Sequence, residues 1–309
     1  MHRKNISVVI PTHNRLPLLE KAIQSVAVQS VLPDELIVVD DGSDTPAGES
    51  IFSGVPPGVH DVLLRTPVAR GAPHARNRGA RQAAGEWLTF LDDDDTFFPH
   101  KIEAVKQVIM ENPDADVIYH PAEIHLVREK ARYRSGTTDL NKGPGALRQL
   151  LVRNVVGGTS MAVVKRSAFL KAGGFDEEMP ALQDWELWIN MAKQDMRFVF
   201  FPDALTRYCH NTSQQSITMV YESMEKAFAR LEEKYAADYA ALGRVEKKQF
   251  DMNKLKNKVF KALLHHNKKA AFTIQGKLFL RSLSPSDLFA LLLMPLGAKT
   301  AFKARSWLH

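Results

Sequence analysis

The stretch WLTFLDDDD, at residues 87–95, decides the fold and points to the chemistry. Its apolar half predicts a buried β-strand, and four aspartates follow that strand directly. Four neighbouring carboxylates repel one another, so we favour a bound divalent cation, which prefers oxygen ligands, as the reason for the run. Aspartates also favour the positive end of a helix dipole, and a helix is expected after Pro99, but such capping explains only one or two of the four.

Working outward, the same pattern occurs earlier in the chain. Residues 6–10 and 36–39 read as buried strands, and the second of them ends in the acidic turn at 40–43. Helical spacing at 18–28 and 75–84 separates the strands, and a weaker strand is expected at 62–64. This alternation predicts βαβ units and a mostly parallel central sheet flanked by helices. In such a sheet the acidic motifs meet at the carboxyl ends of the strands, where ligands bind.

The rest of the chain divides into two parts. Up to about residue 215 we expect helices at 102–110, 147–152 and 182–192, strands at 117–119, 159–164 and 198–201, and a polar stretch reaching Gly145. From Met219 onward the pattern is helical. We therefore predict an α/β domain over 1–215, with one half at 1–100 and the other at 101–215, and a C-terminal helical extension over 216–309.

Composition excludes several classes of protein. The 309 residues are 45% hydrophobic and 25% charged, as in globular domains, so disordered, collagen-like and disulfide-scaffold proteins are ruled out. Cys209 is the single cysteine, so an intramolecular disulfide or a cysteine-cluster metal site is excluded. The apolar stretch before Pro11 is too short for a signal peptide. We expect a cytoplasmic protein, with peripheral attachment to the inner face of the cell membrane as a hypothesis.

Charge is distributed unevenly along the chain. The net charge is +6, but residues 243–309 hold 14 Lys and Arg against 3 Asp and Glu, which leaves the preceding part with an acidic balance. An acidic body does not predict a nucleic-acid partner. The tail interleaves Lys254, Lys256, Lys258 and Lys261 with apolar residues. It predicts either a helical subdomain packed on the body or attachment to an anionic membrane surface, and the two are compatible.

At this point the motifs resemble a known family, the inverting family-2 glycosyltransferases of GT-A fold that build bacterial cell-surface polysaccharide and lipopolysaccharide. The resemblance rests on SVVIPTHNR (7–15), VVDDGS (38–43), ARNRG (75–79) with GEWLTFLDDDD (85–95), GGFDE (173–177) and QDWELW (183–188). Each motif alone is a weak signal, but their occurrence together in this order is specific. The Gln-x-x-Arg-Trp motif of the processive synthases is not found, which favours addition of a single sugar.

The resemblance implies that 1–215 is the catalytic domain, with the nucleotide-sugar half at 1–100 and the acceptor half at 101–215, and it implies roles for individual residues. The implied nucleotide-sugar contacts are Pro11, Thr12, Asn14, Arg15, Asp41, Arg76, Asp92 and Asp93. Thr12 and Asp41 resemble the residues that hold the uracil of a UDP-sugar. Asp94 is similar to the direct ligand of Mn²⁺ or Mg²⁺, and Asp92 completes the DxD motif. Asp184 resembles the catalytic base, and inversion of a UDP-α-sugar would yield a β-linkage.

The chemistry of transfer agrees with these roles. A base must take the proton of the acceptor hydroxyl, and a cation must neutralise the departing diphosphate. Asp184 also suits a helix N-terminus, and the two roles are compatible. His210 lies in RYCH (207–210), where relatives carry a similar but shifted segment, so a metal or diphosphate role is weighed equally against an ordinary hydrogen-bonded histidine.

We therefore expect an enzyme of the hexosyltransferase type that acts on a lipid-linked glycan acceptor in O-antigen, capsule or lipopolysaccharide-core biosynthesis. A second hypothesis is a nucleotidyltransferase that makes a sugar nucleotide, although residues 11–16 do not form the glycine-rich phosphate loop that this chemistry favours. A third is a non-catalytic protein that binds a nucleotide-sugar. The acceptor side is expected in the stretch 120–160.

Overall fold

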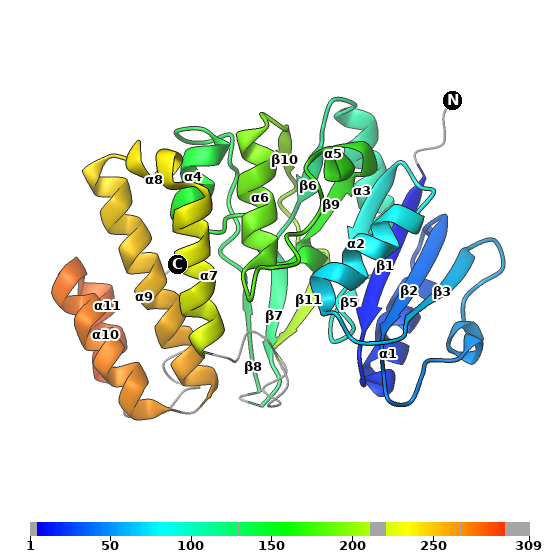
Figure 1. Ribbon diagram of the computed structural model, residues 1–309, viewed down its shortest axis with the longest axis horizontal. Helices are drawn as coiled ribbons and strands as arrows, with labels where there is room; N and C mark the ends of the chain where they lie inside the picture. The colour runs from blue at the N-terminus through cyan, green and yellow to red at the C-terminus, as the bar shows by residue number, and fades with distance from the viewer. Residues whose placement is uncertain (1–4, 129, 211–220, 266, 294–309) are drawn as a thin grey trace.

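The structure is a computed structural model, and it describes residues 5–128, 130–210, 221–265 and 267–293. Figure 1 shows strands β1 to β3 at one end of the molecule and helices α9 to α11 at the other. The predicted start of the helical tail at Met219 lies outside the described residues, as do the tail residues 294–309.

A seven-stranded sheet forms the centre of the body, in the order β10-β6-β9-β4-β1-β2-β3. Its strands are β1 (Ile6–Thr12), β2 (Glu35–Asp41), β3 (His60–Thr66), β4 (Trp87–Phe90), β6 (Val117–Tyr119), β9 (Ala162–Lys165) and β10 (Phe198–Phe200). Neighbouring strands run parallel except that β9 is antiparallel to both β4 and β6. The predicted mostly parallel sheet is confirmed.

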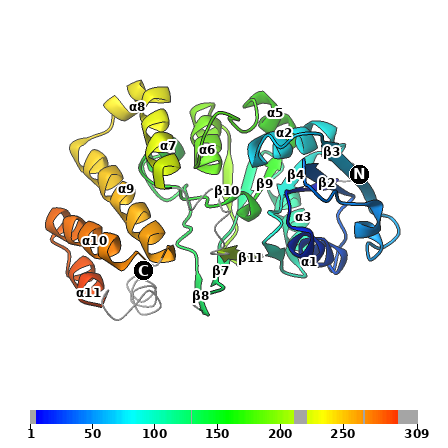
Figure 2. The ribbon, with the colours of Figure 1, turned by 60° about the horizontal axis from the view of Figure 1, so that its bottom comes forward.

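Helices cover both faces of this sheet (Figure 2). Helices α1 (Leu16–Ala27) and α3 (Lys101–Glu111) lie on one face, and α2 (Ala72–Gln82), α5 (Arg166–Lys171) and α6 (Gln183–Lys193) on the other. Side chains of β1 alternate between two apolar cores, with Val8 facing α1 and Val9 facing α2. A strand buried on both faces is uniformly apolar, which is why these runs could be recognised in the sequence.

A four-stranded sheet follows, in the order β5-β11-β7-β8, and the sequence did not predict it. Its strands are β5 (Thr96–Phe97), β7 (Ala122–Leu126), β8 (Ala131–Arg134) and β11 (Thr206–His210). In β7 the alternate residues Ala122, Ile124 and Leu126 are buried while their neighbours are polar. This alternation is the signal of a half-buried strand, and it was hidden within the predicted polar stretch.

The C-terminal helices pack on the body. They are α7 (Tyr221–Lys234), α8 (Ala236–Ala240), α9 (Arg244–Leu264), α10 (Lys268–Ser282) and α11 (Pro285–Leu293), and α4 (Ala146–Val152) lies between α9 and α6. Trp185 of α6 packs its ring against Phe228 of α7 and Phe250 of α9. The division of the chain at about residue 215 stays a prediction, and the apolar core is continuous across it.

The GGFDE segment holds α7 in place. Asp176 pairs with Arg230 and Lys234 of α7, and fully buried Glu186 accepts a hydrogen bond of 2.6 Å from the hydroxyl of Tyr235. Charge-assisted bonds to buried groups are among the stronger polar contacts in proteins. Asp176 of this motif and Glu186 of α6 therefore join the body to the C-terminal helices.

None of the helices in the described part of the chain combines the length and the apolar character needed to cross a membrane.

Candidate active site

The loop after β4 places three of its four aspartates on a cavity of 1110 Å³. Asp92, Asp93 and Asp94 line this cavity, and we refer to them as the acidic wall. The ends of β1 and β2 contribute Pro11, Thr12 and Asp41 beside it. Parallel strands end at one edge of the sheet, so residues far apart in the chain converge there, as the sequence predicted.

The acidic wall is bonded to the loop that follows β1. Thr12 donates its hydroxyl hydrogen to Oδ2 of Asp93 at 2.8 Å, and Nη1 of Arg15 lies 3.2 Å from Oδ1 of the same residue. Arg15 also reaches Oδ2 of Asp94 at 3.1 Å. Burial raises the pKa of Asp93 to about 7, and burial together with the charge of Asp92 raises that of Asp94. The wall therefore holds carboxylates that favour a further cation.

Arg76 of α2 supports the wall from the other side. Its guanidinium pairs with Oδ1 of Asp92, and Thr159 donates to both oxygens of that carboxylate at 3.3 Å. Helix α2 comes close to β1 because it carries Gly79, where a Cβ would lie 2.4 Å from the side chain of Val9. The ARNRG motif thus supplies both Arg76, which pairs with the acidic wall, and Gly79, which lets α2 approach the sheet.

Asp41 organises the neighbouring loop. Its carboxylate accepts backbone hydrogen bonds from Arg70 at 3.0 Å and from Gly71 at 2.6 Å. Gly42 follows with a φ of +71°, and a Cβ there would meet the backbone of Ala69 at 2.5 Å. The Asp-Gly pair therefore brings the segment around residue 70 against the end of β2, where it forms part of the cavity lining.

Asp95 has a structural position. It is not among the residues that line the cavity, and only 1% of its surface is exposed. Its Oδ1 accepts a hydrogen bond of 2.8 Å from the backbone N–H of Cys209 in β11. The buried Lys101 is a nearby opposite charge, and its ammonium donates to the carbonyl of Ser160 at 2.8 Å. The metal hypothesis treated the four aspartates as one cluster, but the fold separates Asp95 from the acidic wall.

Asp184 lies in the first turn of α6 and lines the same cavity. Its Oδ2 accepts a hydrogen bond of 3.1 Å from Nδ2 of Asn154, whose Oδ1 accepts the N–H of Gly157 at 2.9 Å. Burial raises the pKa of Asp184 to about 6, against the opposing effects of the Trp185 backbone and Arg76. A carboxylate with this pKa is suited to accept a proton near neutral pH. Asn154 was not predicted from the sequence, because a single asparagine outside any motif carries no signal.

His210 lines the cavity, but its neighbours are aromatic. Its ring stacks edge-on with those of Tyr208 and Phe260, each at a centroid distance of 5.1 Å. Burial lowers the pKa of His210 to about 4, so the imidazole is neutral at physiological pH. A neutral imidazole can donate a hydrogen bond or bind a metal, and the role of His210 as a ligand stays a prediction.

Asn14 is the one predicted site residue of the N-terminal motif that the cavity lining does not include in the described part of the chain. Its φ is +55°, and its side chain exchanges hydrogen bonds of 3.0 and 2.8 Å with Asp44. Asn14 therefore joins the loops after β1 and β2, and a contact with the nucleotide-sugar stays a prediction.

The acidic wall fits a hard divalent cation by its donor chemistry. Within the described residues, no group of three or more His, Cys, Asp or Glu side chains is arranged as a ready ligand set, so Asp92, Asp94 and His210 do not form one. Mg²⁺, however, takes only one or two protein carboxylates and completes its shell with water and substrate phosphates. Asp92 and Asp94 supply such oxygens at the surface of the cavity.

Comparison with known proteins identifies the family. The model of glycosyl transferase family 2 matches residues 7–172, more than half of the chain, and the chain belongs to this family. The match spans the strand ends, the acidic wall and α2, but it ends before Asp184. The class of protein that the fold and site define is therefore a glycosyltransferase, which does not favour the nucleotidyltransferase hypothesis.

Similar sequences carry the same description. An uncharacterized glycosyltransferase of Haemophilus influenzae is 29% identical over 86% of this chain and 87% of its own length. The uncharacterized glycosyltransferase YwdF of Bacillus subtilis is 28% identical over 79% of this chain and 87% of its own.

Solved structures share the fold at lower identity. The S. aureus protein TarS, residues 1–349 in complex with UDP-GlcNAc, superposes with a TM-score of 0.63 at 19% identity, over 98% of this chain and 88% of that one. The mannosyltransferase PcManGT from Pyrobaculum calidifontis, in complex with GDP-Man and Mn²⁺, gives 0.57 at 17% identity over the same shares. The α/β fold with a mostly parallel sheet is confirmed.

Proposed function

We propose that the protein is an inverting glycosyltransferase that moves a single sugar from a UDP-sugar to a hydroxyl of a lipid-linked glycan. The observation that carries the proposal is the pairing, in one cavity, of the acidic wall with a separate carboxylate, Asp184, whose pKa lies at about 6. The binding of UDP-GlcNAc by the structurally similar TarS supports the choice of donor.

In this mechanism the acceptor hydroxyl gives its proton to Asp184 as its oxygen attacks the anomeric carbon. The bond between that carbon and the diphosphate oxygen breaks on the opposite face, and UDP leaves with the electron pair. Asn154 holds the carboxylate of Asp184 in position. Arg15 and Arg76 keep the acidic wall in place.

A divalent cation would be held by Asp92 and Asp94, with Mn²⁺ or Mg²⁺ as the proposed ion. When bound, it supplies positive charge that stabilises the departing diphosphate. The Mn²⁺ in the PcManGT complex supports this proposal. We assign the nucleoside to the part of the cavity beside the wall that Pro11, Thr12 and Asp41 line, at the ends of β1 and β2.

Release of UDP tests the function. We would measure it across a panel of UDP-sugars with Mn²⁺ or Mg²⁺, with and without a polyprenyl-diphosphate-sugar acceptor, and after addition of a chelator. We expect one donor to give acceptor-dependent release that the chelator abolishes. Binding of UDP without release from any donor would instead identify a non-catalytic nucleotide-sugar-binding protein.

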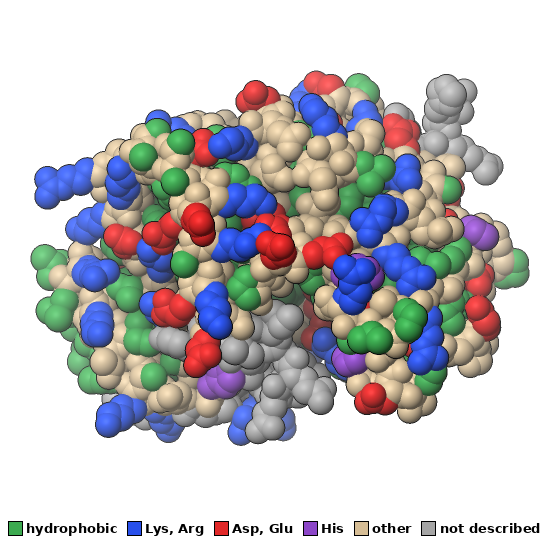
Figure 3. All heavy atoms as spheres, in the orientation of Figure 1, with side chains coloured by type: hydrophobic (Ala, Val, Ile, Leu, Met, Phe, Trp, Pro, Cys, Tyr) green, Lys and Arg blue, Asp and Glu red, His purple; other side chains and the backbone are tan. Residues whose placement is uncertain are grey.

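The C-terminal helices support a peripheral position at the inner face of the membrane, in the pathway of O-antigen, capsule or lipopolysaccharide core. Helices α10 and α11 expose Phe272, Leu280, Phe289 and Leu292. Figure 3 shows such hydrophobic side chains together with Lys and Arg at the left edge of the molecule, where these helices lie. Apolar anchors among basic residues bind anionic bilayers.

Liposome flotation tests this position. We expect the intact chain to float with vesicles that contain anionic lipid, and the variant Leu280→Glu/Leu292→Glu to float less. Equal partitioning of the two proteins would argue against attachment through these helices.

A further inference from the structure

The lysines of α9 divide into two sets. Lys254 pairs with Glu232 at 2.6 Å, and Lys258 pairs with Glu225 at 2.6 Å, so both join α9 to α7. Lys256 and Lys261 instead line the cavity that contains the acidic wall. The basic tail seen in the sequence thus includes a part that faces the active site.

The side of α9 that lines the cavity forms a second wall of it. Asn253, Lys256, Asn257 and Lys261 recur at helical spacing along it, and Arg153 lines the cavity beside them. We call Arg153, Lys256 and Lys261 the basic wall. Among the described residues of the C-terminal helices, Asp287 of α11 is the acidic residue that lines the cavity.

The basic wall is tied to the proposed base through three consecutive residues. Nδ2 of Asn253 donates to the carbonyl of Val152 at 3.0 Å, which anchors α9. Arg153 follows, and its Nη2 donates to the hydroxyl of Thr138 at 3.2 Å. Asn154 comes next and bonds to Asp184. A group held by the basic wall therefore lies on the side of the cavity where Asp184 meets the acceptor.

The basic wall includes cations that are partly or fully buried. Only 3% of Lys261 is exposed, and burial lowers the pKa of its ammonium to about 8. Burial also lowers the pKa of Arg153. Phe260 and Leu264 line the cavity next to Lys261, so the site combines cations with an apolar surface.

We propose that the basic wall binds a phosphate group of the acceptor while Asp184 acts on its hydroxyl. Arg and Lys are the side chains that recognise phosphate in proteins, through charge and several N–H donors. The phosphate belongs either to a prenyl carrier, whose chain would meet Phe260 and Leu264, or to the glycan itself. The inference rests on the proposed function, because it assigns the acceptor side of the same cavity.

Binding to the UDP complex tests the inference. The full-length protein is saturated with UDP and Mg²⁺, so that the donor side is filled, and is then titrated by calorimetry with inorganic phosphate and with geranyl phosphate. We expect saturable binding that weakens with added salt. The variant Arg153→Gln/Lys256→Gln should raise the Kd at least tenfold, and Lys261→Gln provides a second variant.

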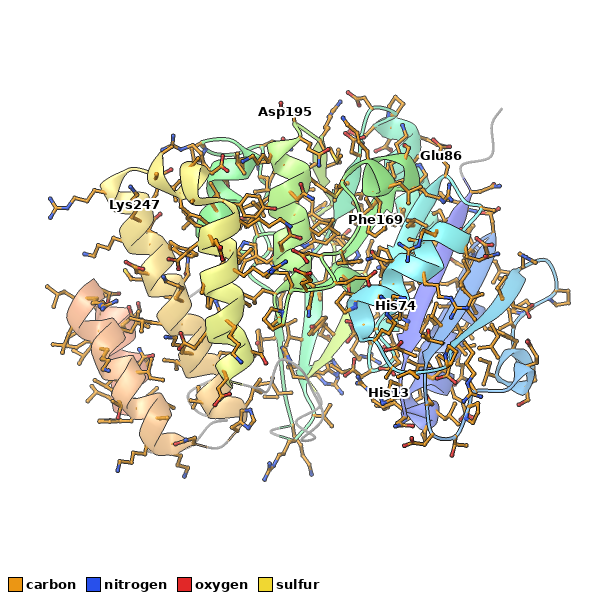
Figure 4. All side chains as sticks on the ribbon, viewed as in Figure 1. His13, His74, Glu86, Phe169, Asp195 and Lys247 are labelled. Atoms are coloured by element: carbon orange, nitrogen blue, oxygen red, sulfur yellow. The ribbon has the colours of Figure 1, made fainter. Side chains whose placement is uncertain are left out.

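Lys247→Gln is the matched control. Lys247 lies near the N-terminal end of the same helix, α9, as Figure 4 shows. It is not among the described residues that line the cavity. Its substitution removes the same charge and should leave the Kd within twofold. Tighter binding of geranyl phosphate than of inorganic phosphate would identify the prenyl carrier, and equal binding would identify a phosphorylated glycan.

Two results would overturn the inference. One is the absence of saturable binding of both phosphates by a protein that still binds UDP, and the other is an unchanged Kd in a folded double variant. Either would leave the proposed transfer reaction in place. Failure to bind UDP itself would instead remove the proposed function, so the two failures are distinguishable.

Discussion

The acidic wall and the basic wall face one cavity, yet they are built in different ways. The acidic wall comes from consecutive residues, Asp92 to Asp94, at the end of a single strand. The basic wall takes Lys256 and Lys261 from one face of α9 and Arg153 from the segment after α4. A local run of like charge is visible in a sequence, whereas a helix face acquires its role only when the helix is docked.

The largest expected effect lies between the walls, at Asp184. We expect Asp184→Asn to lower kcat by about 10²–10⁴-fold, because the amide cannot accept the hydroxyl proton, while UDP-sugar affinity is retained. Steady-state kinetics and calorimetry would measure the two quantities. Asp195→Asn is the control, because this exposed residue lies just beyond the other end of α6 (Figure 4). Near-normal turnover in Asp184→Asn would remove it as the base.

The next effect breaks the acidic wall itself. Asp94→Asn should lower kcat by about 10²-fold through loss of charge near the departing diphosphate, and raise the Mn²⁺ concentration needed for half-maximal rate. Asp95→Ala provides the comparison. It leaves the partly buried N–H of Cys209 without its acceptor, so we expect it to lower the free energy of unfolding by about 1–3 kcal/mol. Equal stability losses in the two variants would contradict the separation of Asp95 from the wall.

A smaller effect concerns the pH dependence of Asp184. Its charged surroundings are Arg76 of α2, which lowers the pKa of this carboxyl, and Asp92, which raises it. The amide of Asn154 also lowers that pKa by favouring the carboxylate. A base works when deprotonated, so activity should fall as the pH drops through about 6, and Asn154→Ala should move this limb to higher pH by about one unit.

The profile of kcat/KM against pH would measure this shift. Asn141→Ala is the control, since Asn141 is exposed and lies outside the cavity lining that the structure describes. A lower rate in Asn154→Ala with an unmoved limb would assign Asn154 a purely structural role.

The smallest effect is expected on the side of α9 that faces α7. Lys258→Gln removes an ion pair with Glu225 in which both partners are partly exposed. Such pairs contribute about 0–1 kcal/mol, so the free energy of unfolding should change little and turnover should not change. A large loss of activity in this variant would show that the two sets of lysines in α9, those paired with α7 and those lining the cavity, do not have separate roles. Thermal unfolding and UDP release would measure both quantities.

The sequence predicted the main sheet well for a physical reason. Strands β1, β2 and β4 are buried on both faces, so they appear as continuous apolar runs, and acidic residues stand at the ends of β2 and β4. The short strands β7 and β8 were missed because their alternation spans only a few residues between polar loops. The direction of β9 was also not predicted, because pairing direction leaves no mark on a short apolar strand.

The residues of the candidate site likewise fall into those that the sequence could identify and those that it could not. Residues in runs or motifs, such as Arg76, Asp92 and Asp184, could be identified from the sequence, and they line one cavity. The four aspartates could not be told apart, because only its burial and its hydrogen bond with β11 distinguish Asp95 from its neighbours. Asn154 was not recognised either, since its importance comes from a single contact between segments distant in the chain.

By itself, therefore, the sequence determined the family, the parallel core and the acidic strand end, because these depend on local hydrophobic patterns and consecutive residues. Only the tertiary structure decided which aspartates face the cavity, what holds Asp184, and that Lys256 and Lys261 of α9 face the same space. The reason is that a side chain's environment is set by the elements packed around it. Burial, pairing and exposure to a cavity arise from contacts between residues far apart in the chain.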